Sequence, residues 1–224
     1  MSTFFLRKKV FFSLFVFFIY TFIAISLFYA ERIKNVQAYD LNQTFYFLVH
    51  TNENVEVGAY TVPLNGGAGY LLQTSSGETV AYTVYTKYSD AERGQNNVSD
   101  SAIECIDVST VYFKTKKEKH NAQKFLGVMR SLYGCIEVLQ AEINRLSKGA
   151  TQESSKRVLK DLKGVFDRLT EESEKDSPKI TRLCEKTAER LQRNIDGVVY
   201  CKDLRYILCD LCFSYVKIAS EFSL

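Results

Sequence analysis

The sequence predicts an α+β protein in three parts: an N-terminal transmembrane helix, a small sheet domain and a C-terminal antiparallel helical bundle. Three observations lead to this prediction. Residues 10–30 contain no charged side chain, and residues 40–112 alternate aromatic and β-branched runs with turn-forming residues. Residues 116–224 are rich in Lys, Glu, Arg and Leu, with apolar side chains every three or four positions. The expected boundaries place the cytoplasmic tail and anchor in residues 1–34.

The apolar run at residues 10–30 has the length of a membrane-spanning helix. A helix rises ~1.5 Å per residue, so about 20 residues cross a hydrocarbon core ~30 Å thick. The alternative is a cleaved signal peptide, whose apolar region is usually about 7–15 residues long. The basic residues Arg7, Lys8 and Lys9 precede the run and favour a cytoplasmic N-terminus. We therefore expect a single-pass protein of the cell membrane with its C-terminal domains outside the cytoplasm.

The charge is unevenly distributed behind the expected anchor. Residues 31–115 hold five basic and ten acidic side chains, whereas residues 116–224 hold 21 basic and 16 acidic ones. The two halves could dock on one another through opposite charge, or each charge set could be a solvated face. The overall charge of +3 is no indication of nucleic-acid binding, and no nucleic-acid partner is expected.

The sheet domain shows six elements in the order β-α-β-β-α-β. A short helix is expected from Val55 to near Pro63, and a second one begins near Asp90. The four strands are expected at residues 44–50, 70–73, 79–86 and 101–108. This order predicts a ferredoxin-like, four-stranded antiparallel sheet with two helices on one face and the other face exposed.

The segments FYFLV, GGAGYLL and VAYTVYTKYSDAE, within residues 44–108, resemble the SPOR domain of bacterial cell-envelope proteins. In that family, a strand followed by Asp/Glu-Ala in a helix is typical of the second half, as in residues 82–91 here. Leu48 and His50 stand where the family usually has a polar residue and a glycine. The resemblance implies a non-enzymatic protein that binds peptidoglycan glycan strands through the exposed sheet face.

Tyrosines on that face are the candidate ligands, because they supply flat aromatic surfaces and hydrogen-bonding edges to a sugar. If Phe45 and Phe47 face the helices, the side chains between them face the exposed side. The candidates for glycan binding are Tyr46, His50, Tyr70 and Tyr85. The alternative is that they pack as ordinary strand residues or beneath the bundle, and a shift of one residue would invert the assignment.

Four amphipathic helices are expected in the C-terminal part, at residues 116–148, 152–175, 178–196 and from residue 200 to the end. Short connections favour an up-down bundle that contacts a protein partner, with a coiled coil between chains as the alternative. All six cysteines except Cys105 fall in predicted helices, including the C-x-x-C pair Cys209 and Cys212. Buried thiols, disulfides and a metal site stay open as alternatives. We expect no catalytic residue, metal or cofactor.

Overall fold

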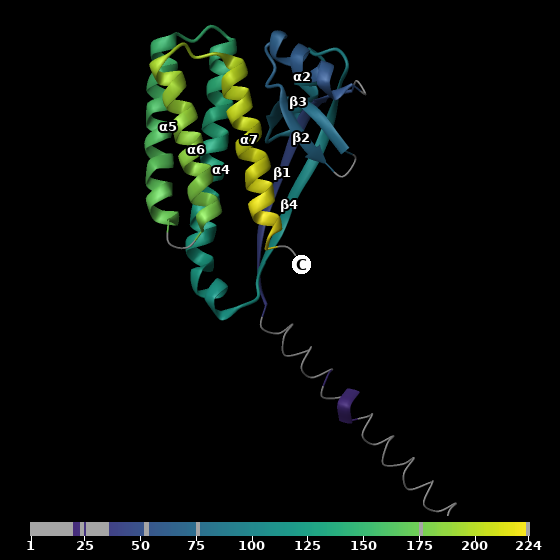
Figure 1. The fold of residues 1–224 in the computed structure, drawn as a ribbon, viewed down its shortest axis with the longest axis vertical. Coiled ribbons are helices and arrows are strands. Elements are labelled where there is room, and N and C mark those ends of the chain that lie inside the picture. Colours follow the sequence, from purple (N-terminus) through teal and green to yellow (C-terminus); the bar gives the residue numbers. More distant parts are fainter. Residues whose placement is uncertain are drawn as a thin grey trace, which may run out of the picture.

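The computed structural model describes residues 20–22, 25, 36–51, 54–74, 77–174 and 177–222. A four-stranded sheet stands beside a four-helix bundle, and their long axes run in roughly the same direction (Figure 1). The sheet comprises β1 (Gln37–His50), β2 (Tyr70–Thr74), β3 (Gly77–Tyr85) and β4 (Ser101–Phe113). Its helices are α2 (Val55–Leu64) and α3 (Tyr88–Gln95). The bundle comprises α4 (Lys116–Ser147), α5 (Gln152–Ser173), α6 (Pro178–Asp196) and α7 (Cys201–Ser220).

The strands lie in the order β2-β3-β1-β4, and every neighbouring pair is antiparallel. The element order and the α+β class are those expected from the sequence. β1 and β4 are longer than expected, because Gln37, which precedes the predicted start of β1, pairs with Phe113, which follows the predicted end of β4. A bulge between Asp40 and Gln43, where Asn42 has φ 48°, interrupts the alternation that marks a strand in the sequence.

The transmembrane helix predicted for residues 10–30 is the main correction. No helix among the described residues is both long enough and apolar enough to cross a membrane. Most of residues 10–30 lie outside the described part of the chain, which includes only residues 20–22 and Ile25 of them. The longest described helix, α4, has 32 residues but alternates buried and exposed positions as an amphipathic helix does. The predicted anchor is therefore contradicted, and so is the single-pass placement in the cell membrane with domains outside the cytoplasm.

Local sequence explains where the helices begin. Asn54 caps α2 by accepting a hydrogen bond from the Val57 N–H at 3.1 Å. Thr115 and Glu118 form a capping box at the start of α4, in which each side chain accepts from the backbone of the other. Pro178 occupies the first turn of α6, where a missing N–H costs little.

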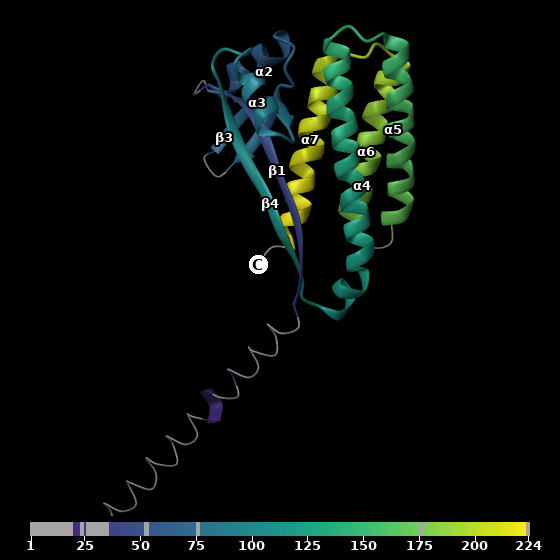
Figure 2. The same cartoon turned by 180° about the vertical axis from the view of Figure 1, so that it is seen from behind.

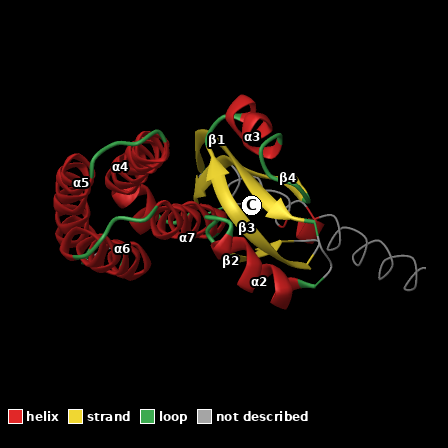
Figure 3. Cartoon of the chain, turned by 90° about the horizontal axis from the view of Figure 1, so that it is seen from above, coloured by secondary structure: helices red, strands yellow, loops and turns green. Residues whose placement is uncertain are grey.

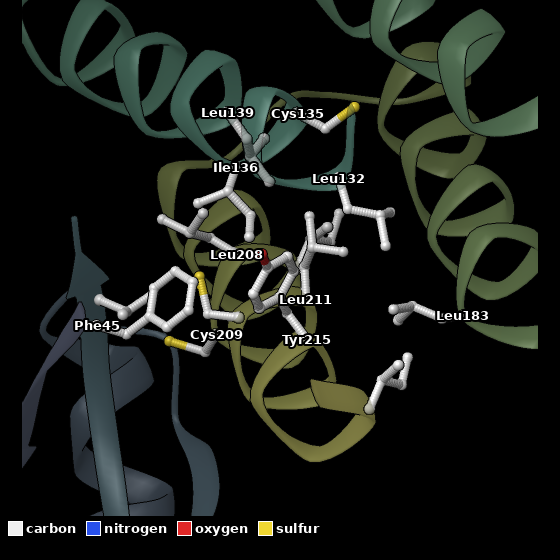
Figure 4. Packing of buried hydrophobic residues seen from close by; sticks show 14 of the residues in the cluster. Phe45, Leu132, Cys135, Ile136, Leu139, Leu183, Leu208, Cys209, Leu211 and Tyr215 are labelled. Carbon is white, nitrogen blue, oxygen red and sulfur yellow. The ribbon is translucent and has the colours of Figure 1, made fainter. Parts of the chain in front are cut away.

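Both faces of the sheet are covered, whereas one was expected to be exposed, with packing beneath the bundle as the alternative. On one face α2 and α3 pack over a small cluster that includes Leu48 and Val80. On the other face α7 contacts β2, β3 and β4, and it lies between the sheet and the other three bundle helices (Figures 2 and 3). Phe45 and Phe47 are fully buried there and belong to one apolar core shared by the sheet and the bundle. Figure 4 shows Phe45 among the side chains of α4 and α7.

The predicted orientation of β1 is therefore inverted. Phe45 and Phe47 point to the bundle, whereas Tyr46 and Leu48 lie on the α2–α3 side. β3 also contains a bulge. Leu48 of β1 pairs with Thr83 and the next residue, Val49, pairs with Ala81, so Tyr82 is an extra residue with no partner in β1. As a result Ala81 belongs to the shared core, whereas Tyr82 belongs to the cluster under α2.

Candidate functional site

The structure does not bring the four predicted glycan ligands to one face. Tyr46 lies against Tyr88 of α3, with ring centroids 5.6 Å apart. Tyr85 packs so closely on α3 that a Cβ added to Gly94 would lie 2.4 Å from the Tyr85 hydroxyl oxygen. The ring of His50 lies 6.0 Å from that of Tyr82. These three candidates are on the α2–α3 side of the sheet.

Tyr70 is on the opposite side, beneath α7. It is 8% exposed, and its hydroxyl donates to Oδ1 of Asp210 at 3.2 Å. Its ring meets that of Tyr206 edge-on, with centroids 5.3 Å apart. Burial and the adjacent Asp210 carboxylate raise the pKa of Tyr70, so its hydroxyl stays protonated and donates at neutral pH. Tyr70 thus links β2 to the bundle.

A line of cations runs along one face of α6. Its members recur every three or four residues and so share one face of the helix: Lys179, Arg182, Lys186, Arg190 and Arg193. At a rise of ~1.5 Å per residue the line extends over about 21 Å. It faces α7, which adds Lys217 at one end. We call these six residues the basic seam.

The basic seam borders two hollows between α6 and α7. The larger, about 480 Å³, is lined by Lys179, Arg182, Lys186 and Lys217, with Glu221 as its one acidic residue. Leu183 and Ile218, each 6% exposed, also line it. The smaller hollow, about 220 Å³, lies at the other end, and its lining includes Arg190, Arg193, Asn194, Asp203 and Tyr206.

Only part of this positive charge is balanced within the fold. Lys179 pairs with Glu221, and Asp210 holds both Lys186 at 3.1 Å and Arg190 at 2.6 Å. Arg190 also lies over the Tyr206 ring, 4.8 Å from its centroid. By contrast Arg182, Arg193 and Lys217 have no carboxylate within 4.0 Å among the described residues. All three are exposed, so they can meet an anionic partner.

The cysteines do not form a reactive or metal-binding site in the described part of the chain. All six are free thiols, and Cys209 and Cys212 are 0% exposed within the shared core. Burial raises the pKa of Cys135 to about 11 and that of Cys184 to about 12, which keeps both thiols neutral at physiological pH. No group of three or more His, Cys, Asp or Glu side chains there is placed to hold a metal ion. The geometry corresponds to the buried-thiol alternative.

The basic seam was missed in the sequence, although its signal is visible. The spacing K-x₂-R-x₃-K-x₃-R-x₂-R from residue 179 places five cations on one helical face. Glu185 and Glu189 lie on the same helix and hide the pattern in any count of net charge. They line a third hollow, between α5 and α6, to which Arg193 of the basic seam also contributes.

Comparisons with protein-family models, with curated proteins and with solved structures find no match for this chain. The resemblance of residues 44–108 to the SPOR domain therefore stays a prediction.

Proposed function

We propose that this protein is a non-enzymatic interaction protein that binds an acidic, amphipathic segment of a partner protein along the basic seam. The observation that carries the proposal is the line of cations on α6, of which Arg182 and Arg193 have no carboxylate partner in the described chain. An acidic segment would supply the missing charge. The proposal keeps the predicted role of the bundle in protein contact.

The floor of the larger hollow favours a protein segment over a purely ionic ligand. Leu183 and Ile218 offer apolar surface beneath a rim of Lys and Arg, so apolar side chains and carboxylates of one segment can be satisfied together. A helical segment of about 14 residues matches the length of the seam.

The covered sheet weighs against glycan binding through β1. A sugar strand needs exposed aromatic surface, but Tyr70 is 8% exposed and lies under α7. Tyr46 and Tyr85 pack on α3 on the other side of the sheet. An interaction role for the bundle needs no rearrangement of these contacts.

Binding is tested with the full chain and a fluorescein-labelled 16-residue peptide with Leu at helical spacing and Glu at the flanking positions. Fluorescence anisotropy should show saturable binding that weakens as NaCl rises, because rim charges are screened within a Debye length. The Arg182→Glu/Arg193→Glu variant should bind about 10–30-fold more weakly, since each reversal replaces an attraction of roughly 0.5 kcal/mol with a similar repulsion.

The matched control is Arg157→Glu/Lys160→Glu, which makes the same change of net charge on exposed positions of α5. It should leave the affinity within about twofold of the parent chain, because exposed charges at a distance are screened. Equal weakening in both variants would show non-specific attraction and refute the seam as the binding site. Absence of saturable binding to the parent chain at low salt would refute the proposal as a whole.

A further inference from the structure

A half-enclosed cavity of about 140 Å³ lies at the end of the bundle nearest the C-terminus, next to the Lys179 end of the basic seam. It forms because α4 has 32 residues, whereas α5 has 22 and α6 has 19, so the first turns of α4 extend past the neighbouring helix ends. Asn121, Phe125 and Val128 line it from α4. Phe113 at the end of β4 and Ile180 at the start of α6 complete the apolar wall.

Three phenylalanine rings hold one side of the cavity in place. Phe125 and Phe222 have centroids 4.6 Å apart, and Phe113 lies 5.7 Å from Phe125 and 5.3 Å from Phe222. The Phe222 carbonyl accepts a hydrogen bond from the Tyr112 N–H at 2.6 Å, which ties the end of α7 to β4. The wall is therefore preformed.

Several polar groups around the cavity are hydrogen-bonded within the fold or exposed to solvent. Glu118 accepts from the N–H groups of Lys114 and Thr115, and the Ser173 hydroxyl donates to the Leu169 carbonyl. Lys124 and Glu172 are exposed and mark the side that meets solvent. Asn121 and Ser177 are half-exposed polar residues of the lining, and most of the remaining inner surface is carbon.

We infer that this cavity is a binding site for a small, uncharged apolar molecule with a flat ring or a short hydrocarbon group, of about six to nine non-hydrogen atoms. A dry cavity of ~150 Å³ lined by aliphatic and aromatic side chains is large enough for benzene. Preformed apolar pockets with a few polar groups at the mouth are typical of small-molecule sites.

Indole is a suitable probe, because the chain contains no tryptophan and indole fluorescence can be followed without background. Addition of the full chain should shift indole emission to shorter wavelength and raise the Tm by about 3–6 °C at ten times Kd. Glycerol, which is of similar size but polar, should give neither effect. Unshifted indole emission at the highest soluble concentration of protein would overturn the inference.

Two variants locate the binding. Asn121→Phe adds a ring at a half-exposed lining position, and Val128→Phe fills the cavity from a buried one. Each should weaken indole binding about tenfold or more by occupying the space. Val138→Phe makes the same change on an exposed part of α4 and should leave binding within about twofold. If Asn121→Phe, with its fold confirmed by circular dichroism, binds indole as the parent chain does, the cavity is not the site.

Discussion

Replacement of Asp210 by Asn is the sharpest test of the contact between sheet and bundle. One carboxylate oxygen accepts from the Tyr70 hydroxyl of β2 at 3.2 Å, and the other binds Arg190 at 2.6 Å and Lys186 at 3.1 Å, both on α6. Asp210 itself is on α7 and is 8% exposed. A single buried charge thus joins three elements, and the Asn variant keeps its shape while removing that charge.

The expected cost follows from these contacts. Breaking a fully buried ion pair costs about 3–5 kcal/mol. The Lys186 side chain is 51% exposed, so solvent screens its attraction to Asp210 and the loss of this pair costs less. We expect Asp210→Asn to lower the free energy of unfolding by about 2–3 kcal/mol and the Tm by about 4–12 °C. Tyr70→Phe loses one hydroxyl hydrogen bond and should cost about 1 kcal/mol. Because the Asn amide oxygen can still accept from the Tyr70 hydroxyl, but as a weaker, uncharged acceptor, the two costs overlap and the double variant should cost less than the sum.

Urea unfolding followed by circular dichroism measures all three variants. Asp161→Asn is the control, since Asp161 is exposed on α5 and its replacement should change stability by about 0.5 kcal/mol or less. A free energy of unfolding within about 0.5 kcal/mol of the parent for Asp210→Asn would refute the proposed role of this carboxylate. So would strictly additive costs for Tyr70 and Asp210.

Three further outcomes are expected. Gly127→Ala should stabilise the protein by about 0.5–1 kcal/mol, because a Cβ at this position of α4 meets nothing within 4 Å. Gly67→Ala should destabilise it, because the new Cβ would lie 2.5 Å from the Val62 side chain, and thermal unfolding compares the two variants. Thr115→Ala should cost about 1 kcal/mol by removing the cap of α4, as measured by urea unfolding. The free energy of unfolding should fall as pH rises from 9 towards 12, because the Cys184 thiol loses its proton at lower pH in the unfolded chain than in the folded protein, where burial raises its pKa. Cys184→Ala removes this thiol and should reduce the slope by up to about 1.4 kcal/mol per pH unit.

Helix boundaries were predictable because their signals are local. Thr115 with Glu118, and Pro178 in a first turn, mark helix starts through contacts within a few residues. The four bundle helices and the order of the six sheet-domain elements follow from such signals together with periodicity. The predicted membrane anchor rested on the length of one apolar run, and the described helices do not support it.

The faces of β1 were not predictable, because both are buried. Phe45 and Phe47 are 0% exposed on one face, and Leu48 on the opposite face is 1% exposed. A strand buried on both sides has no polar face, so alternation cannot show which side meets which partner. The bulge at Tyr82 then breaks the alternation in β3 as well.

The candidate site was only partly readable from the sequence. The spacing of the cations on α6 is a local pattern, but which of them stay without an ion pair depends on the carboxylates that α7 and the residues after it place opposite them. Tyr70 and Asp210 are 140 residues apart in the chain, and no local pattern links them. The ion pairs that α7 forms with α6 and its hydrogen bond with the sheet depend on tertiary packing, which composition does not encode.

Native-state alkylation with iodoacetamide, resolved by residue with mass spectrometry, tests the central claim that α7 closes the sheet face. Cys209 and Cys212 are 0% exposed on α7, within the core shared with the sheet, whereas Cys105 is exposed on β4. In the folded protein we predict modification of the exposed Cys105, slowed because partial desolvation and the adjacent Asp107 raise the pKa of its thiol, and protection of Cys209 and Cys212 until the chain unfolds. Modification of Cys209 as fast as that of Cys105 under native conditions would contradict the closed sheet face.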